Sequence, residues 1–111
     1  MGFAVLLRER DRRREELRKR TLASAREAAK ALRELFAFQD LYVIGSVLGP
    51  RFRLTSDVDL VVAGLDMREF HRAHAFLMEK IGGPLAIDLK ALEDLPESMQ
   101  RRIREQGVRV A

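Results

Sequence analysis

The sequence predicts one small domain of the α/β (α+β) class, a sheet of short strands backed by helices. Apolar residues recur at steps of three and four in two segments, the spacing of a helix face, and a third segment carries helix-capping residues. Shorter apolar runs of strand length alternate with these segments, which gives the order helix, strand, strand, helix, strand, helix. With 111 residues, the chain can build one hydrophobic core. Strand order and direction remain open from this pattern.

The first predicted element is a long helix over residues 8–37, uninterrupted by Gly or Pro. Its apolar positions lie one helical turn apart, which places them on a common face. The first half is almost wholly charged, so we expect residues 1–20 to be a helical extension that projects from the core or frays. The positions that share the apolar face are Leu17, Thr21, Ala25, Ala28, Leu32 and Leu35.

The strands are predicted from short apolar runs rich in Val, Ile and Leu. The first covers residues 41–44 and the second residues 57–63, with a turn and a loop at 45–56 between them. The third covers residues 85–89, and residues 108–110 predict a short terminal strand.

Two further helices are predicted from their capping residues. Asp66 followed three residues later by Glu69 has the spacing of a capping box, and the helix it opens ends at the Gly-Gly-Pro sequence of residues 82–84. Asp94 is predicted to cap the last helix, which ends at Gly107.

The basic excess of the chain lies at its N-terminal end. Residues 1–20 carry eight Arg and Lys against four Asp and Glu, a net charge of +4, while the other 91 residues carry thirteen of each. The charges alternate in sign and lack interleaved aromatic residues, so a solvated helix is expected and direct nucleic-acid binding is not. Contact with RNA or with a protein partner through this helix is the alternative.

Composition sets further expectations. The chain contains no cysteine, which excludes disulfides and thiolate metal sites and agrees with a cytoplasmic location. No signal peptide or membrane-spanning stretch is recognisable, so we expect a protein without membrane attachment. His71 and His74 lie one helical turn apart, a spacing that suits zinc, but no third ligand is evident and surface histidines are expected.

The residues richest in chemical content lie between the first two predicted strands. Gly45 and Ser46 end the first strand, and after ten residues Asp57 and Asp59 begin the second. Side chains alternate along a strand, so the two carboxylates share one face and repel each other unless a cation lies between them. Mg²⁺ prefers oxygen ligands of this kind, together with substrate phosphates, and a Gly-Ser turn offers N–H groups to a phosphate. The combination indicates a nucleotide site.

This pattern of Gly-Ser, ten residues and Asp-x-Asp resembles the DNA polymerase β-type nucleotidyltransferase superfamily, and the small size resembles its minimal nucleotidyltransferases (MNT proteins). The resemblance covers residues 30–108 and implies a small mixed sheet. It also implies a third acidic residue on a later strand, at the position of Asp88. One departure concerns the phosphate loop, where Pro50 occupies the usual position of a second glycine and Gly49 comes one residue early.

The resemblance implies transfer of a nucleotide from ATP with two Mg²⁺ ions, or Mn²⁺, held by Asp57, Asp59 and Asp88. Gly45 and Ser46 would hold the phosphates. Asp88 would complete the acceptor-side ion and take the acceptor's proton. Arg51 and Arg53 in the connecting loop would reach the triphosphate, unless they are solvated loop charges.

MNT proteins pair with HEPN-type helical partners in toxin–antitoxin modules, which implies that this chain is an antitoxin modifying a tyrosine of such a toxin. A chain of this length would borrow its acceptor surface from the partner or from a second copy of itself. The alternative is a non-catalytic antitoxin that neutralises a helical partner by occlusion. The metal site would then be weak or vestigial, in keeping with the altered phosphate loop at Pro50. The alternatives for the single residues are a turn-and-strand-start pair for Asp57 and Asp59, an exposed strand residue for Asp88, and a strand-ending turn for Gly45 and Ser46.

Overall fold

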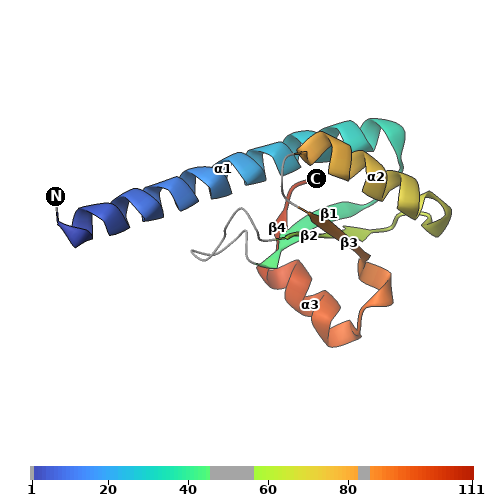
Figure 1. Ribbon diagram of the computed structural model, residues 1–111. Coiled ribbons are helices and arrows are strands. Elements are labelled where there is room, and N and C mark those ends of the chain that lie inside the picture. The colour runs from blue at the N-terminus through green and yellow to red at the C-terminus, as the bar shows by residue number, and fades with distance from the viewer. Residues whose placement is uncertain (1, 46–56, 83–85) are drawn as a thin grey trace.

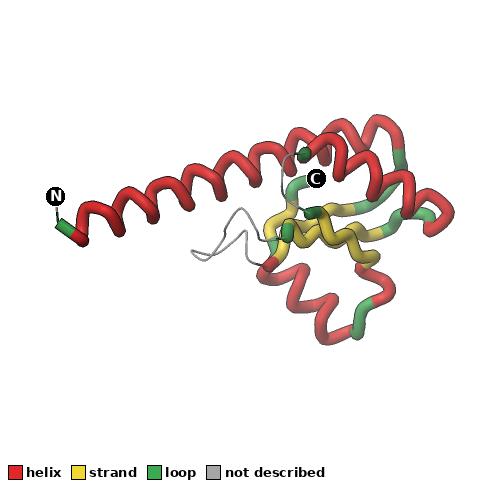
Figure 2. Tube along the Cα trace, viewed as in Figure 1, coloured by secondary structure: helices red, strands yellow, loops and turns green. Residues whose placement is uncertain are grey.

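The computed structural model describes residues 2–45, 57–82 and 86–111, and the helices and strands that it contains are shown in Figures 1 and 2. In chain order they are α1 (Phe3–Leu35), β1 (Asp40–Ile44), β2 (Val58–Ala63), the 3-10 turn η2 (Met67–Glu69), α2 (Phe70–Ile81), β3 (Ile87–Ala91), the 3-10 turn η3 (Leu92–Asp94), α3 (Glu97–Gln106) and β4 (Val108–Arg109). The predicted order of elements is therefore confirmed.

The four strands form one mixed sheet in the order β3-β2-β1-β4. β1 pairs antiparallel with β2 and with β4, whereas β2 and β3 run parallel. A parallel pair needs a crossover connection, and α2 supplies it between β2 and β3. The α/β (α+β) class with a small mixed sheet, backed by helices and preceded by a long N-terminal helix, is the predicted fold.

The two faces of the sheet carry different helices. Figure 1 shows α1 and α2 together on one face and α3 on the other. Side chains alternate along β2, so Leu60 and Val62 join the larger core beneath α1 and α2, while Val61 and Ala63 join a smaller core beneath α3. Any polar side chain one period before Val61 on β2 therefore lies on the α3 face.

The first half of α1 projects beyond the rest of the molecule (Figure 1). Among the described residues of α1, burial begins only at Thr21, and Phe3, Leu6 and Leu7 are 76, 54 and 41% exposed. The Cα radius of gyration is 15.3 Å, against about 13 Å for a compact domain of this length. The charged first half of α1 therefore extends away from the sheet (Figure 1). No described helix combines the length and the apolar character that crossing a membrane requires.

We expect amides of residues 6–12 to exchange with solvent through an opening free energy of about 1 kcal/mol or less, since this half lacks tertiary packing. Amides of residues 25–33 should be far better protected, because this part of α1 packs on the core through the buried side chains of Ala25, Ala28 and Leu32. Hydrogen-exchange mass spectrometry on peptides from the two halves measures this difference. Equal protection along α1 would contradict the expectation and would show that another chain covers the first half.

Several predicted boundaries are corrected by the backbone. α1 ends at Leu35, because Phe36 turns to extended geometry while its N–H still bonds the Leu32 carbonyl. The third strand is Ile87–Ala91, two residues later than predicted. Asp94 does not cap α3; it ends η3, and Pro96 precedes the helix without a side-chain cap.

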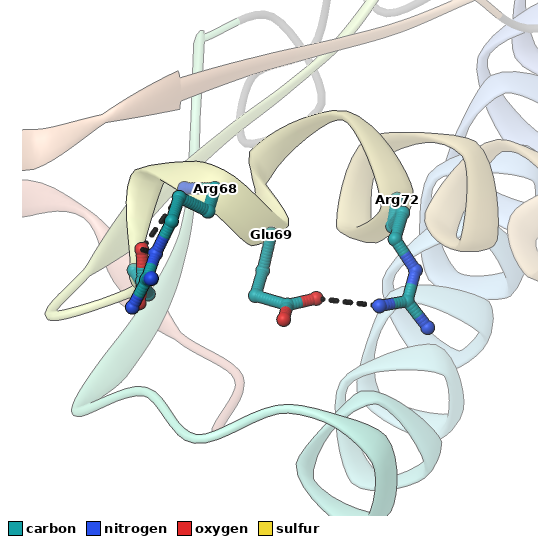
Figure 3. Close-up of polar contacts among 4 residues, drawn as sticks. Arg68, Glu69 and Arg72 are labelled. Carbon is teal, nitrogen blue, oxygen red and sulfur yellow. Dashed lines mark hydrogen bonds and ion pairs between the residues drawn. The ribbon is translucent and has the colours of Figure 1, made fainter.

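The start of α2 shows how the predicted capping box differs from the actual contacts (Figure 3). Asp66 accepts a hydrogen bond from the Arg68 N–H at 2.9 Å and so caps η2. Its pair with the Arg68 side chain lowers the pKa of the carboxyl to about 2. The Glu69 side chain bonds Arg72 at 3.0 Å and makes no return bond to Asp66, so the reciprocal box is wrong.

Candidate active site

Two carboxylates meet where β2 and β3 run parallel. Asp59 is the in-register partner of Asp88, so their side chains lie next to each other on one face of the sheet. That face is the α3 face, because Asp59 precedes Val61 by one strand period. Both side chains are half-buried, whereas Asp57, just before β2, is exposed. The sheet thus joins two of the three predicted acids directly, although they are 29 positions apart in the sequence.

The carboxyl of Asp59 lies in a setting that disfavours its charge. Burial is the main cause that raises its pKa above the ordinary 3.8, and the nearby charges of Asp88 and Asp57 raise it further. The ammonium of Lys90 opposes them. A metal cation bound beside Asp59 would, like Lys90, favour the ionised carboxylate and lower its pKa.

Lys90 lies two residues after Asp88 on the same strand face. Its ammonium donates a hydrogen bond to Asp88 Oδ2 at 2.5 Å. This bond is the main cause that raises the pKa of Lys90, and the charges of Asp88 and Asp59 add to it. Strand alternation predicts that Lys90 shares the sheet face of Asp88. It does not predict that Lys90 bonds Asp88 and so belongs to the site. The missing information was how closely β2 and β3 bring the charges together.

Gly45 closes the site from the end of β1. Its φ is +80°, a conformation that side chains other than glycine rarely adopt. A Cβ at this position would overlap the Oδ2 atom of Asp59, because the preceding residue, Ile44, is the register partner of Asp59. The glycine therefore leaves space for the carboxylate itself, a reason that the sequence did not reveal. Ser46, Arg51 and Arg53 lie outside the described residues.

The oxygen donors of Asp59 and Asp88 suit a hard divalent cation, and Lys90 already places one positive charge against them. Within residues 2–45, 57–82 and 86–111, no three His, Cys, Asp or Glu side chains converge as a metal-binding group. Mg²⁺ commonly takes only one or two carboxylates and completes its shell with water and substrate phosphates. The two carboxylates therefore fit Mg²⁺, and water and substrate phosphates would supply its remaining ligands.

A pocket of about 280 Å³ adjoins the site on the α3 face. Ile44 and Gly45 at the end of β1 form one wall, and Met99, Arg102 and Ile103 of α3 form the other. Its lining is mostly apolar, and Arg102 and Gln106 are the polar residues that contribute to it. Such a pocket can take the apolar face of a ligand whose anionic part lies toward Gly45.

The two histidines of α2 lie in different surroundings. His74 is half-buried, and its Nε2 lies 2.8 Å from the carbonyl oxygen of Ile87 at the start of β3. His71 is exposed. His74 thus joins α2 to the strand that carries Asp88, and the pair is one exposed and one half-buried histidine.

We expect Asp59→Asn to stabilise the metal-free protein at pH 7. The folded-state pKa of Asp59 is raised, so the folded state holds this proton more tightly than the unfolded state, and stability falls as the pH rises through that range. The gain should be small, roughly 0.5 kcal/mol, because solvent screens a partly exposed carboxylate. It should vanish below pH 3.8, where Asp59 is itself neutral. Denaturant unfolding with a chelator at pH 3 and 7 tests this, and an equal gain at both values would contradict it.

Comparison with known proteins bears on the fold. No family model and no curated protein matches the sequence. The fold is similar to the crystal structure of a "putative nucleotidyltransferase" from Sulfolobus solfataricus, with a TM-score of 0.53 and 21% sequence identity. The alignment covers 86% of this chain and 91% of the other. At this identity the likeness establishes a common fold, so the predicted nucleotidyltransferase-like fold is confirmed.

Proposed function

We propose that this chain is a metal-dependent nucleotidyltransferase that transfers AMP from ATP to a protein acceptor. The observation that carries the proposal is the in-register pair Asp59 and Asp88, held beside the left-handed Gly45 on one face of the sheet. The Sulfolobus protein with the same fold, itself described as a "putative nucleotidyltransferase", supports the reaction class.

In this proposal Asp57, Asp59 and Asp88 would hold two Mg²⁺ ions, which when bound would supply positive charge for the attacking oxygen and for the leaving pyrophosphate. Gly45 and Ser46 orient the β- and γ-phosphates, and the nucleoside occupies the neighbouring pocket beneath α3. An acceptor hydroxyl attacks the α-phosphorus, its oxygen forms the new P–O bond, and the bond to pyrophosphate breaks. Asp88 takes the hydroxyl proton. Arg51 and Arg53 are proposed contacts to the triphosphate.

The proposed acceptor is a tyrosine of a HEPN-type helical toxin, and the chain is its antitoxin. This part rests on the resemblance of the motif to MNT proteins. It is supported by the projecting half of α1, whose exposed Phe3, Leu6 and Leu7 offer an apolar surface that this chain does not cover. A partner that packs there would extend beyond the end of the sheet at which Gly45 lies.

Intact-mass spectrometry of a co-purified helical partner, before and after incubation with this chain and Mg-ATP, tests the proposal. A gain equal to one AMP on the partner, absent without nucleotide, is the expected result. Incubation with CTP, GTP and UTP in parallel establishes which nucleotide is used. A stable complex whose masses never change would overturn transferase activity.

A second candidate is a non-catalytic antitoxin that neutralises the same partner by covering its active surface. It is favoured by the lack of a three-ligand metal group within the described residues. The Asp57→Ala/Asp59→Ala double variant separates the two, because occlusion needs complex formation alone. Neutralisation that survives in this variant would favour occlusion, and its loss from an intact complex would favour catalysis.

A further inference from the structure

We propose that Lys90 is a built-in counter-ion of the Asp59–Asp88 pair, which a divalent cation must displace in order to bind. The inference deepens the proposed function and rests on it, since it concerns how the same site exchanges one cation for another. In this inference Lys90 is a positioning residue. Metal binding releases it from Asp88, and it can then contact the triphosphate.

The geometry places the ammonium directly against one member of the acid pair, Asp88. Lys90 donates to Asp88 Oδ2 at 2.5 Å, and Asp88 is the register partner of Asp59 across β2 and β3. The Lys90 charge acts on both carboxylates and is the largest effect that offsets the burial of Asp59. Adjacent carboxylates on neighbouring strands repel each other, so a positive charge at this place stabilises the metal-free fold.

The same position conflicts with a bound metal ion. A divalent cation that coordinates Asp88 would compete for the oxygen that Lys90 bonds, and its double charge would repel the ammonium. Lys90 can leave without unfolding β3, because its side chain is 47% exposed and extends on a flexible four-carbon stem. The released ammonium has lost its carboxylate partner and lies beside the bound metal ion. It is then available to form an ion pair with a phosphate of the nucleotide. Metal binding thereby prepares a contact for the triphosphate.

The test is calorimetric titration of the whole chain with Mn²⁺ alone, with no nucleotide present. Lys90→Met removes the charge and keeps the length of the stem, so we expect it to bind Mn²⁺ about tenfold more tightly than the wild type. Lys90→Arg retains the charge and should bind no more tightly than the wild type. Lys30→Met is the matched control, since it removes one charge from an exposed pair with Glu27 on α1. It should bind as the wild type does.

Thermal unfolding adds a readout that does not depend on calorimetry. In a chelator, Lys90→Met should melt below the wild type and the Lys30→Met control, and saturating Mn²⁺ should raise its Tm by more than it raises theirs. If the wild type binds Mn²⁺ and Lys90→Met matches it in both affinity and Tm shift, the counter-ion inference is wrong while the proposed function stands. If no variant binds Mn²⁺, the proposed metal site fails, and the inference that depends on it fails as well.

Discussion

Asp59→Asn is expected to abolish nucleotidyl transfer while leaving the fold intact. Asp59 is central in the site, with Asp88 beside it in register, Gly45 against its Oδ2 atom and the Lys90 charge nearby. An amide keeps the shape but removes the negative charge that a metal ligand supplies. Loss of metal-based charge stabilisation amounts to several kilocalories per mole, roughly 10³-fold in rate. Single-turnover assays of labelled AMP transfer to the partner measure this.

Asp94→Asn provides the matched control for this experiment. Asp94 is an exposed aspartate at the end of η3, and its replacement removes the same charge outside the acid pair. We expect transfer by this variant within about twofold of the wild type, because a distant exposed charge is screened by solvent. Transfer that persists in Asp59→Asn at a comparable rate would exclude Asp59 as a metal ligand.

Gly45→Ala is expected to remove activity and to lower stability together. The backbone at Gly45 has φ of +80°, where a Cβ costs about 1–2 kcal/mol. The new methyl group would also take the space of Asp59 Oδ2, so the carboxylate must leave its present position in the acid pair. We therefore expect a loss of Mn²⁺ affinity and a fall in transfer that approaches the effect of Asp59→Asn. Denaturant unfolding, metal titration and the transfer assay measure the three quantities.

Gly64→Ala separates the backbone effect from the effect on the site. Gly64 has a similar φ of +76°, but the atoms that a Cβ would meet belong to the side chain of Gln39, which is exposed and able to move. We expect a comparable loss of stability in both variants and a loss of metal binding only in Gly45→Ala. If the two variants bind Mn²⁺ equally well, then Gly45 does not maintain the position of Asp59.

Local patterns in the sequence predicted the type and order of the α-helices and strands that the structure describes. The spacing of Ala25, Ala28 and Leu32 carries this information because it marks the buried face of α1. The continuous apolar runs of β1 and β2 carry it because these strands are buried on both faces of the sheet. The predicted element boundaries were wrong where one residue type suits more than one local structure. Asp94 has the residue type of a helix cap, yet the 3-10 turn η3 uses it as its last residue. Strand order could not be predicted, since it depends on contacts between distant segments.

For the candidate site, too, the sequence predicted the residues but not their arrangement in space. The spacing of Asp57 and Asp59 on one predicted strand, with Asp88 on a later one, was enough to select the acids. Their arrangement was not predictable, because the register of β2 against β3 is a tertiary property. For the same reason, the contact of Gly45 with Asp59 and the pairing of Lys90 with Asp88 emerged only from the structure.

The position of β3 at one end of the sheet has a consequence for solubility. An edge strand presents unpaired backbone groups, and such an edge is a template for pairing with other chains and for aggregation. Lysine on an edge strand opposes that pairing, and Lys90 is the last residue but one of β3. His74 contacts the carbonyl of Ile87 and so engages part of the same edge. The charged strand that serves the acid pair therefore also protects the molecule against edge-to-edge association.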